Sequence, residues 1–144
     1  MISAGLFNSR NQELNTPIDK YREWDKEFHF NTDPCTTSDN PLGTKHFYTK
    51  EDNALIQKWI APVFINPPYG HQLPNWVKRA SMEAKSGNVP IVMLLPARTD
   101  TQWFHDYIYY GKATEIRFLK GRLVFGELKN SAPFPSMLAI FREG

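Results

Sequence analysis

Cysteine is almost absent from this chain of 144 residues, since Cys35 is the only one. A single cysteine excludes a disulfide framework within the chain and a cysteine-based zinc site. The histidines show no ligand spacing with one another, so no metal site is predicted. These four residues are His29, His46, His71 and His105.

Long hydrophobic runs and a strong charge of one sign are absent as well. The longest apolar run, 89–97, contains two prolines and has the length of a strand, far below the roughly 20 residues of a membrane span. Residues 1–10 lack the apolar core of a signal peptide. We therefore expect a soluble protein of the reducing cytoplasm with no membrane partner. The net charge of +2 permits a nucleic-acid partner without requiring one.

The composition that remains, 41% hydrophobic and 14% aromatic, is ordinary for a globular domain. The length fits one domain with its own core. We expect this domain to cover residues 15–144, preceded by a flexible arm over residues 1–14.

Helical periodicity alternates with short apolar runs along most of the chain. Thr16 is expected to cap the first helix, with Pro17 as its first residue, and Asp33-Pro34 to end the first strand. This alternation predicts a mixed α/β fold with a mostly parallel sheet and an antiparallel end. The expected helices are 17–28, 49–59, 74–87 and 101–109, and the expected strands are 28–32, 45–48, 63–65, 89–95, 114–119, 123–125 and 136–141.

The stretch 63–70 joins a buried-looking strand to Asn66-Pro67-Pro68-Tyr69. Proline fixes its own φ and disfavours helical backbone for the residue before it, so Asn66 and Pro67 are expected to be extended. Neither proline carries an N–H. The loop therefore offers the Asn66 side-chain oxygen and backbone carbonyls, with few donors to compete for them.

Such a loop suits an amine that donates two hydrogen bonds. The exocyclic amine of adenine is a poor nucleophile because its lone pair is delocalised into the ring. Acceptance of its hydrogens by the Asn66 oxygen and the Pro67 carbonyl favours a pyramidal nitrogen, so the loop predicts an amino-methyltransferase that acts by alignment and electrostatics. Tyr69 is expected to stack on the base. The alternative is a strand that ends in a Pro-Pro turn, with Tyr69 packed on the surface.

The chain resembles the phage-type DNA adenine-methyltransferase family, S-adenosylmethionine-dependent enzymes with a Rossmann-like methyltransferase fold. The resemblance covers about Leu14 to Phe141. It rests on matches to the family in the same order along the chain, at Thr16-Pro17, 30–35, 47–52 with Trp59, 66–70, 93–101, 103–105, 121–123 with Phe125, and 132–136.

The resemblance implies that catalysis lies in Asn66-Pro67-Pro68-Tyr69 and that S-adenosylmethionine binds at other residues. Asp33-Pro34 and Asn66-Pro67 both follow expected strands, so both loops are expected to face one crevice. No Gly-x-Gly follows Asp33, so the cofactor turn must be built differently from that of many relatives of this fold. The implied cofactor residues are Thr16, Pro17, Asp33, Pro34 and Cys35, with Asp52 or Asn53 beside the ribose or adenine.

Double-stranded DNA is the expected substrate, and the target adenine must be flipped out of the stack. Arg98, Lys120 and Arg122 are candidates for phosphate or guanine contacts. Phe125, with Phe134 as the alternative, is a candidate for a second aromatic against the base. The small domain predicts either a short recognition sequence or a homodimer that enlarges the footprint.

Two other functions fit the same residues. Adenine in RNA or the side-chain amide of a protein glutamine meets the same hydrogen-bonding requirement as adenine in DNA. A catalytically silent nucleic-acid-binding domain of the same fold is the other, because Asn53-Ala54 stands where family members often have Asp-Gly.

Overall fold

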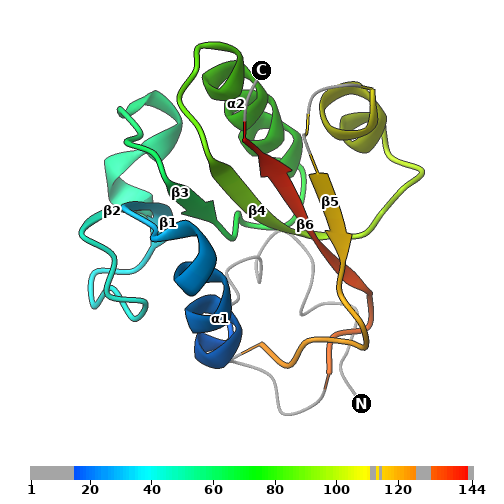
Figure 1. The fold of residues 1–144 in the computed structure, drawn as a ribbon, viewed down its shortest axis with the longest axis horizontal. Coiled ribbons are helices and arrows are strands. Elements are labelled where there is room, and N and C mark those ends of the chain that lie inside the picture. The colour runs from blue at the N-terminus through cyan, green and yellow to red at the C-terminus, as the bar shows by residue number, and fades with distance from the viewer. Residues whose placement is uncertain (1–14, 111–112, 114, 126–130, 143–144) are drawn as a thin grey trace.

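The structure is a computed structural model that describes residues 15–110, 113, 115–125 and 131–142. The described residues form one six-stranded sheet in the order β2-β1-β3-β4-β6-β5 (Figure 1). The strands are β1 (Thr32–Thr36), β2 (His46–Thr49), β3 (Val63–Ile65), β4 (Ile91–Pro96), β5 (Glu115–Phe118) and β6 (Ser136–Phe141). The helices are α1 (Ile18–Phe28), α2 (Leu73–Lys85), the short 3-10 turns η2 (Lys50–Asp52) and η3 (Ala54–Ile56), and the π-helix η4 (Phe104–Tyr109).

The direction of the strands confirms a mostly parallel sheet with an antiparallel end. β1 pairs in parallel with β2 and β3, and β3 pairs in parallel with β4. β6 runs antiparallel to both β4 and β5. All strands except β6 therefore end at one edge of the sheet, which is the edge where open parallel sheets bind ligands.

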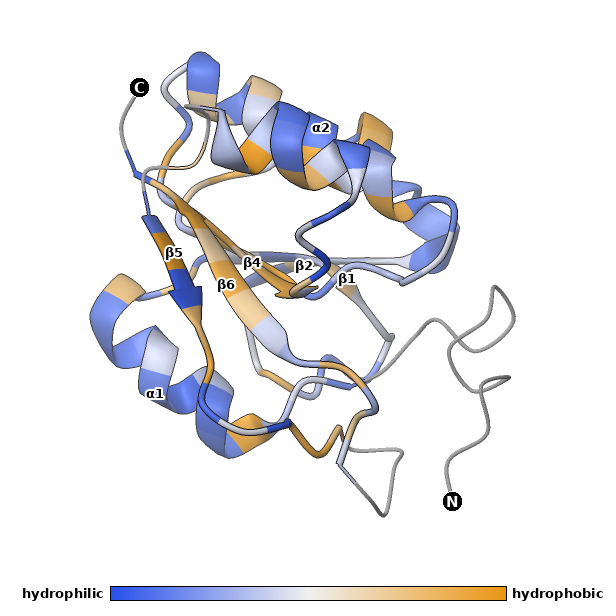
Figure 2. Ribbon diagram, turned by 90° about the vertical axis from the view of Figure 1, so that its right-hand side faces the viewer, coloured by the Kyte–Doolittle hydropathy of each residue, from blue (hydrophilic) through white to orange (hydrophobic). Residues whose placement is uncertain are grey.

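Helices cover both faces of this sheet. Figure 2 shows α1 on one side of the sheet and α2 on the other, and α2 packs against η4. None of the described helices is both long enough and apolar enough to cross a lipid bilayer. The fold is thus a three-layer α/β arrangement in which the central strands are buried from both sides.

The aromatic face of α1 fixes this helix over β3. Tyr21, Trp24 and Phe28 recur at helical spacing and are buried. The Phe64 ring on β3 lies 5.2 Å from Tyr21 and 5.9 Å from Trp24, measured between ring centroids. Offset and edge-on contacts of this kind add about 0.5 to 1.5 kcal/mol each beyond area burial. The predicted helix of residues 17–28 is confirmed within one residue.

The opposite face is covered by the apolar stripe of α2. Trp76, Val77, Ala80 and Ala84 are buried there, as their helical spacing predicts. Gly87 follows with φ +86°, a left-handed backbone conformation that residues other than glycine rarely adopt. The predicted strands 63–65 and 136–141 are also confirmed, and the predicted interior strand 89–95 is present two residues later at its start, as Ile91–Pro96.

The first predicted strand, 28–32, is wrong. His29 ends α1 in a left-handed conformation with φ 54°, and the Phe30 N–H donates to Asp25 Oδ1 at 2.8 Å. The strand begins instead at Thr32 and contains Asp33 and Pro34. Its pairing with β2 is irregular between Asp33 and Thr36. Such an irregularity interrupts the ladder hydrogen bonds, and Pro34, which has no N–H to donate to the ladder, is tolerated there.

The predicted helix 49–59 is also wrong, although the start was identified correctly. Thr49 N–H donates to Asp52 Oδ2 at 2.8 Å, which is one of the two bonds of the capping box formed here, and Thr49 Oγ1 donates to the same oxygen at 3.1 Å. Asn53 then adopts φ 51°, which interrupts the helical path and leaves two 3-10 turns. Trp59 lies beyond them and donates its ring N–H to the Ala54 carbonyl at 2.8 Å.

Two further expectations fail in detail. Residues 123–125 form no strand, because β5 pairs with the distant β6 and the Leu123 carbonyl accepts from Ala132 N–H at 2.8 Å. Thr16 does not cap α1, because Pro17 occupies the capping position and no side-chain bond is made there. The hydroxyl of Thr16 instead accepts from the Asn66 side chain at 3.0 Å. The predicted helix 101–109 is present in part as η4, Phe104–Tyr109, and the predicted strand 114–119 as β5, Glu115–Phe118, while residue 114 lies outside the described residues.

Candidate active site

The proline-rich loop leaves the carboxyl end of β3, the central strand between β1 and β4. Asn66 is 9% exposed and Pro67 is buried, while Pro68 is half-buried. Gly70 closes the loop with φ 125°, and its carbonyl accepts from Leu73 N–H at 3.1 Å where α2 begins. The loop is therefore held at both ends by regular elements.

The Asn66 side chain is bonded to Thr16. Its Nδ2 donates to Thr16 Oγ1 at 3.0 Å, and both residues are buried. The amide oxygen of Asn66 consequently lies on the side of the amide away from Thr16. Sequence patterns gave no sign of this contact, because it joins residues 50 positions apart.

Tyr69 is packed among aromatic rings. Its ring centroid lies 5.5 Å from that of Phe134 and 6.3 Å from that of Phe125, and both contacts are edge-on. Burial raises the pKa of the Tyr69 hydroxyl, an effect that the positive charge of Arg98 partly opposes. That hydroxyl is buried and has no hydrogen-bond partner among the described residues. The Tyr69 ring is therefore part of the buried core, at 4% exposure, and does not lie on the surface as the alternative Pro-Pro turn would place it.

Asp33 and its neighbours on β1 lie beside β3. Asp33 is 2% exposed, and its Oδ1 accepts from Cys35 N–H at 3.1 Å. Burial raises the pKa of Asp33 from 3.8 to about 7, against the lowering effect of that backbone bond. No ion pair reaches this carboxylate within the described part of the chain. A buried carboxylate of this kind favours a cationic ligand.

Asp52 and Asn53 follow β2, the strand beyond β1, and thus belong to the same edge of the sheet. Both are exposed. One oxygen of Asp52 is engaged by Thr49, and its backbone carbonyl accepts from Gln57 Nε2 at 2.8 Å. The turn that carries these two residues is therefore held by hydrogen bonds to both the side chain and the backbone of Asp52.

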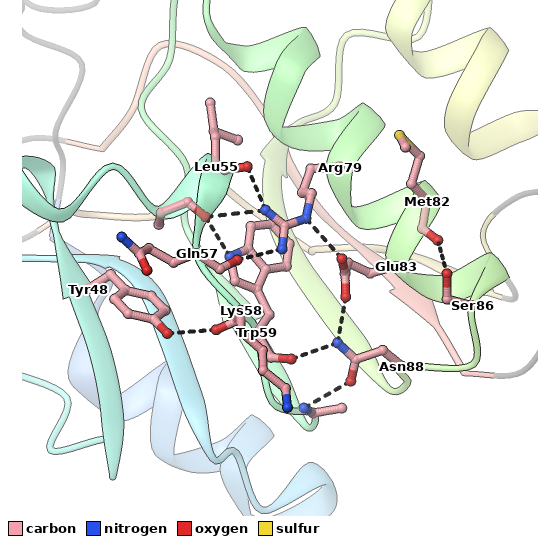
Figure 3. A network of polar contacts seen from close by, with 12 residues as sticks. Tyr48, Leu55, Gln57, Lys58, Trp59, Arg79, Met82, Glu83, Ser86 and Asn88 are labelled. Carbon is pink, nitrogen blue, oxygen red and sulfur yellow. Dashed lines mark hydrogen bonds and ion pairs between the residues drawn. The ribbon is translucent and has the colours of Figure 1, made fainter.

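A polar network supports this turn from α2 (Figure 3). Arg79 donates to the Leu55 and Gln57 carbonyls, each at 2.6 Å, and pairs with Glu83 at 3.0 Å. Its guanidinium lies 4.3 Å from the centre of the Trp59 ring. Cation–π contact and bonds to several carbonyls use the planar fork of arginine, which lysine cannot reproduce. The network was not predicted from the sequence, because its acceptors are backbone atoms.

The candidate DNA residues separate into two groups. Arg98 follows β4, whereas Lys120 and Arg122 follow β5, and all three are exposed at the edge that carries Asn66. Phe125 is instead fully buried and lies against Tyr69. The three cations therefore lie on the protein surface, whereas Phe125 lies beneath it.

A mostly parallel α/β sheet with a polar, proline-rich loop at its carboxyl edge is consistent with a methyltransferase fold. Residues 5–143 match a family model described as DNA N-6-adenine-methyltransferase (Dam). The chain belongs to this family, and the family resemblance seen in the sequence is confirmed. The family name implies a methyl donor.

Two relatives are phage proteins. The DNA N-6-adenine-methyltransferase of Haemophilus phage HP1 (strain HP1c1) is 31% identical over 128 residues, which cover 84% of this chain and 72% of that protein. The DNA N-6-adenine-methyltransferase of Escherichia phage T1 is 34% identical over 79 residues, which cover 54% of this chain and 32% of that protein. No solved structure gives a significant match.

Proposed function

We propose that this protein transfers a methyl group from S-adenosylmethionine to the exocyclic N6 amine of adenine in DNA. The observation that carries the proposal is the position of Asn66-Pro67-Pro68-Tyr69 at the end of the central strand β3, in a chain of the DNA N-6-adenine-methyltransferase family. Because the relatives are phage proteins, we place the reaction in the cytoplasm of an infected bacterium.

Asn66 and Pro67 orient the amine. The Asn66 nitrogen is turned toward Thr16, and the amide oxygen at the opposite end accepts from the adenine amine in this proposal. The Pro67 carbonyl accepts the second hydrogen, and neither Pro67 nor Pro68 brings an N–H that would compete. Two acceptors in fixed positions favour the pyramidal nitrogen needed for attack, which is catalysis by alignment and preorganised electrostatics.

The residues along β1 fit a cofactor that carries positive charge. S-adenosylmethionine supplies an electrophilic methyl on a sulfonium centre and also carries an ammonium group. Asp33, buried and without an ion-pair partner among the described residues, is the group that would balance this charge. Thr16, Pro17, Pro34 and Cys35 would hold the same ligand, with Asp52 and Asn53 at the far side of the edge.

Aromatic residues receive the base. We propose that an adenine flipped from the duplex stacks on Tyr69 and displaces the edge-on contact with Phe125 or Phe134, whose rings already line this position. The exposed cations Arg98, Lys120 and Arg122 would hold the backbone on either side of the flipped nucleotide.

The proposal is tested by incubating the purified protein with S-adenosylmethionine labelled on its methyl group and with duplex DNA, RNA or a glutamine-containing protein in parallel. We expect label only in DNA, recovered after hydrolysis as N6-methyladenine. Label in RNA or protein alone would assign a different acceptor. Binding of DNA without binding of the cofactor by calorimetry would instead indicate a silent domain.

A further inference from the structure

The buried contact between Thr16 and Asn66 assigns a role to Thr16 beyond cofactor binding. Asn66 Nδ2 donates to Thr16 Oγ1 at 3.0 Å, and the two residues are 9% and 7% exposed. We propose that Thr16 is a positioning residue that holds the Asn66 amide with its oxygen toward the adenine amine. The inference rests on the proposed function for the identity of the substrate.

An asparagine amide needs such a contact because its two ends have nearly the same shape but opposite hydrogen-bonding character. Turned by 180°, Asn66 would present an NH2 group to the NH2 group of adenine, and two donors would face each other. Both protein groups are buried, so water does not readily replace the Thr16 hydroxyl as a partner. The orientation of one side chain therefore decides whether the loop accepts an amine or repels it.

The Thr16 hydroxyl selects this orientation of the Asn66 amide when its own hydrogen is donated to another acceptor. A threonine oxygen can accept from Nδ2, or it can donate to Oδ1 of a flipped amide. Thr16 is also among the residues proposed to hold S-adenosylmethionine, which carries acceptor groups. A Thr16 hydroxyl that donates to the cofactor has only its oxygen left for Asn66, and only Nδ2 can pair with it. Cofactor binding should therefore strengthen the orientation seen here.

The backbone on both sides keeps the two residues at this distance. Pro17 biases Thr16 toward extended backbone, and α1 begins immediately afterwards at Ile18. The helix is fixed on β3 through Phe64, two positions before Asn66, whose ring packs against aromatic residues of α1. The same packing that builds the core thus sets the position of Thr16 relative to the catalytic loop.

The contact is tested with Thr16→Val, which replaces the hydroxyl by a methyl of similar size, and Thr16→Ser, which keeps it. Thr44→Val is the matched control, because Thr44 is also buried and bonds a side chain, the Tyr21 hydroxyl, at 3.2 Å. The first readout is the side-chain amide signal of Asn66 in 15N–1H spectra, assigned from its loss in Asn66→Ala. Its exchange with solvent is compared with that of the exposed Asn75.

In the wild type we expect the Asn66 side-chain hydrogens to exchange more slowly than those of Asn75, and more slowly still with cofactor bound. Thr16→Val should shift the Asn66 signal and remove its protection, whereas Thr16→Ser and Thr44→Val should retain it. Equal exchange at Asn66 and Asn75 in the wild type would overturn the inference without any variant. Thr16→Ala repeats the test if Thr16→Val does not fold.

The second readout is turnover with DNA and cofactor both saturating. Loss of one buried hydrogen bond that orients a reacting group should lower kcat of Thr16→Val by about 10-fold to 100-fold, beyond any change in cofactor affinity, with Thr16→Ser close to the wild type. A kcat of Thr16→Val within twofold of the wild type would contradict the role. Absence of DNA methylation by the wild type would refute the proposed function, while the Asn66 amide signal would still decide the contact.

Discussion

The buried carboxylate of Asp33 predicts an opposition between stability and cofactor binding. Burial raises its pKa from 3.8 to about 7, so the folded protein holds a proton there that the unfolded chain releases. Between about pH 4 and pH 7 the native state binds more protons than the unfolded state. The free energy of unfolding should therefore fall as the pH rises through this window, and the contribution of this group should level off above it.

The size of the effect follows from the two pKa values. At about 1.4 kcal/mol for each pKa unit, the charged Asp33 costs the cofactor-free protein up to about 4 kcal/mol above pH 7. Asp33→Asn removes this cost but buries an amide NH2 group, which offsets about 1 to 3 kcal/mol. We expect the variant to be more stable than the wild type at pH 8 by about 1 to 3 kcal/mol.

The assay is urea unfolding of both proteins from pH 5 to pH 8, with the exposed Asp106→Asn as the control. The advantage of Asp33→Asn should grow by about 2 to 3 kcal/mol over this range, whatever the fixed cost of the amide. The same variant should lose most of its affinity for S-adenosylmethionine in calorimetry. A difference in the free energy of unfolding between Asp33→Asn and the wild type that does not change with pH would refute the raised pKa of Asp33. Unchanged affinity for S-adenosylmethionine would refute its role in cofactor binding.

Three further outcomes are expected. The Arg117 guanidinium, with a contribution from Arg142, lowers the pKa of Glu27 to about 2. The ion pair between Glu27 and Arg117 therefore stabilises the fold above about pH 4.5, and this stabilisation is lost as the pH falls toward 2. Because these side chains are a third or more exposed, Glu27→Gln should cost only about 1 kcal/mol in urea unfolding at pH 7 and less at pH 3; an equal cost at both would contradict the ion pair. Arg79→Lys should cost about 2 kcal/mol in the same assay, because it leaves backbone carbonyls without their donor, and a neutral substitution would show that the network contributes no stability. Arg122→Ala should weaken DNA binding and reduce the slope of log K against log salt by about 1, and an unchanged slope would exclude a phosphate contact.

Local patterns were sufficient for the centre of the fold. The run Val63–Ile65 and the stripe of α2 predict a buried strand and a helix that packs on it, and both are present. The alternation of these elements also predicts a parallel sheet, because a parallel connection needs a crossover. The position of the proline-rich loop 66–70 could be predicted in the same way, since it follows directly from the central strand.

Contacts between distant residues could not be predicted in this way. Pro34 indicated the end of a strand, yet it lies inside β1 because the irregular pairing with β2 accommodates it. Residues 123–125 look like a hairpin partner of β5, but β6 takes that place from further along the chain. The bond between Thr16 and Asn66 likewise depends on how α1 packs on β3, and neither residue type specifies it.

The role proposed for Asn66 is to activate the adenine amine. Its most direct test is the N6-methyladenine content of duplex DNA, measured by mass spectrometry of the nucleosides after incubation with S-adenosylmethionine and either wild type, Asn66→Ala or the exposed control Asn75→Ala. We expect wild type and Asn75→Ala to methylate DNA equally, and Asn66→Ala to lose at least about 1000-fold in rate with cofactor affinity nearly unchanged. Methylation by Asn66→Ala at the wild-type rate would contradict the account.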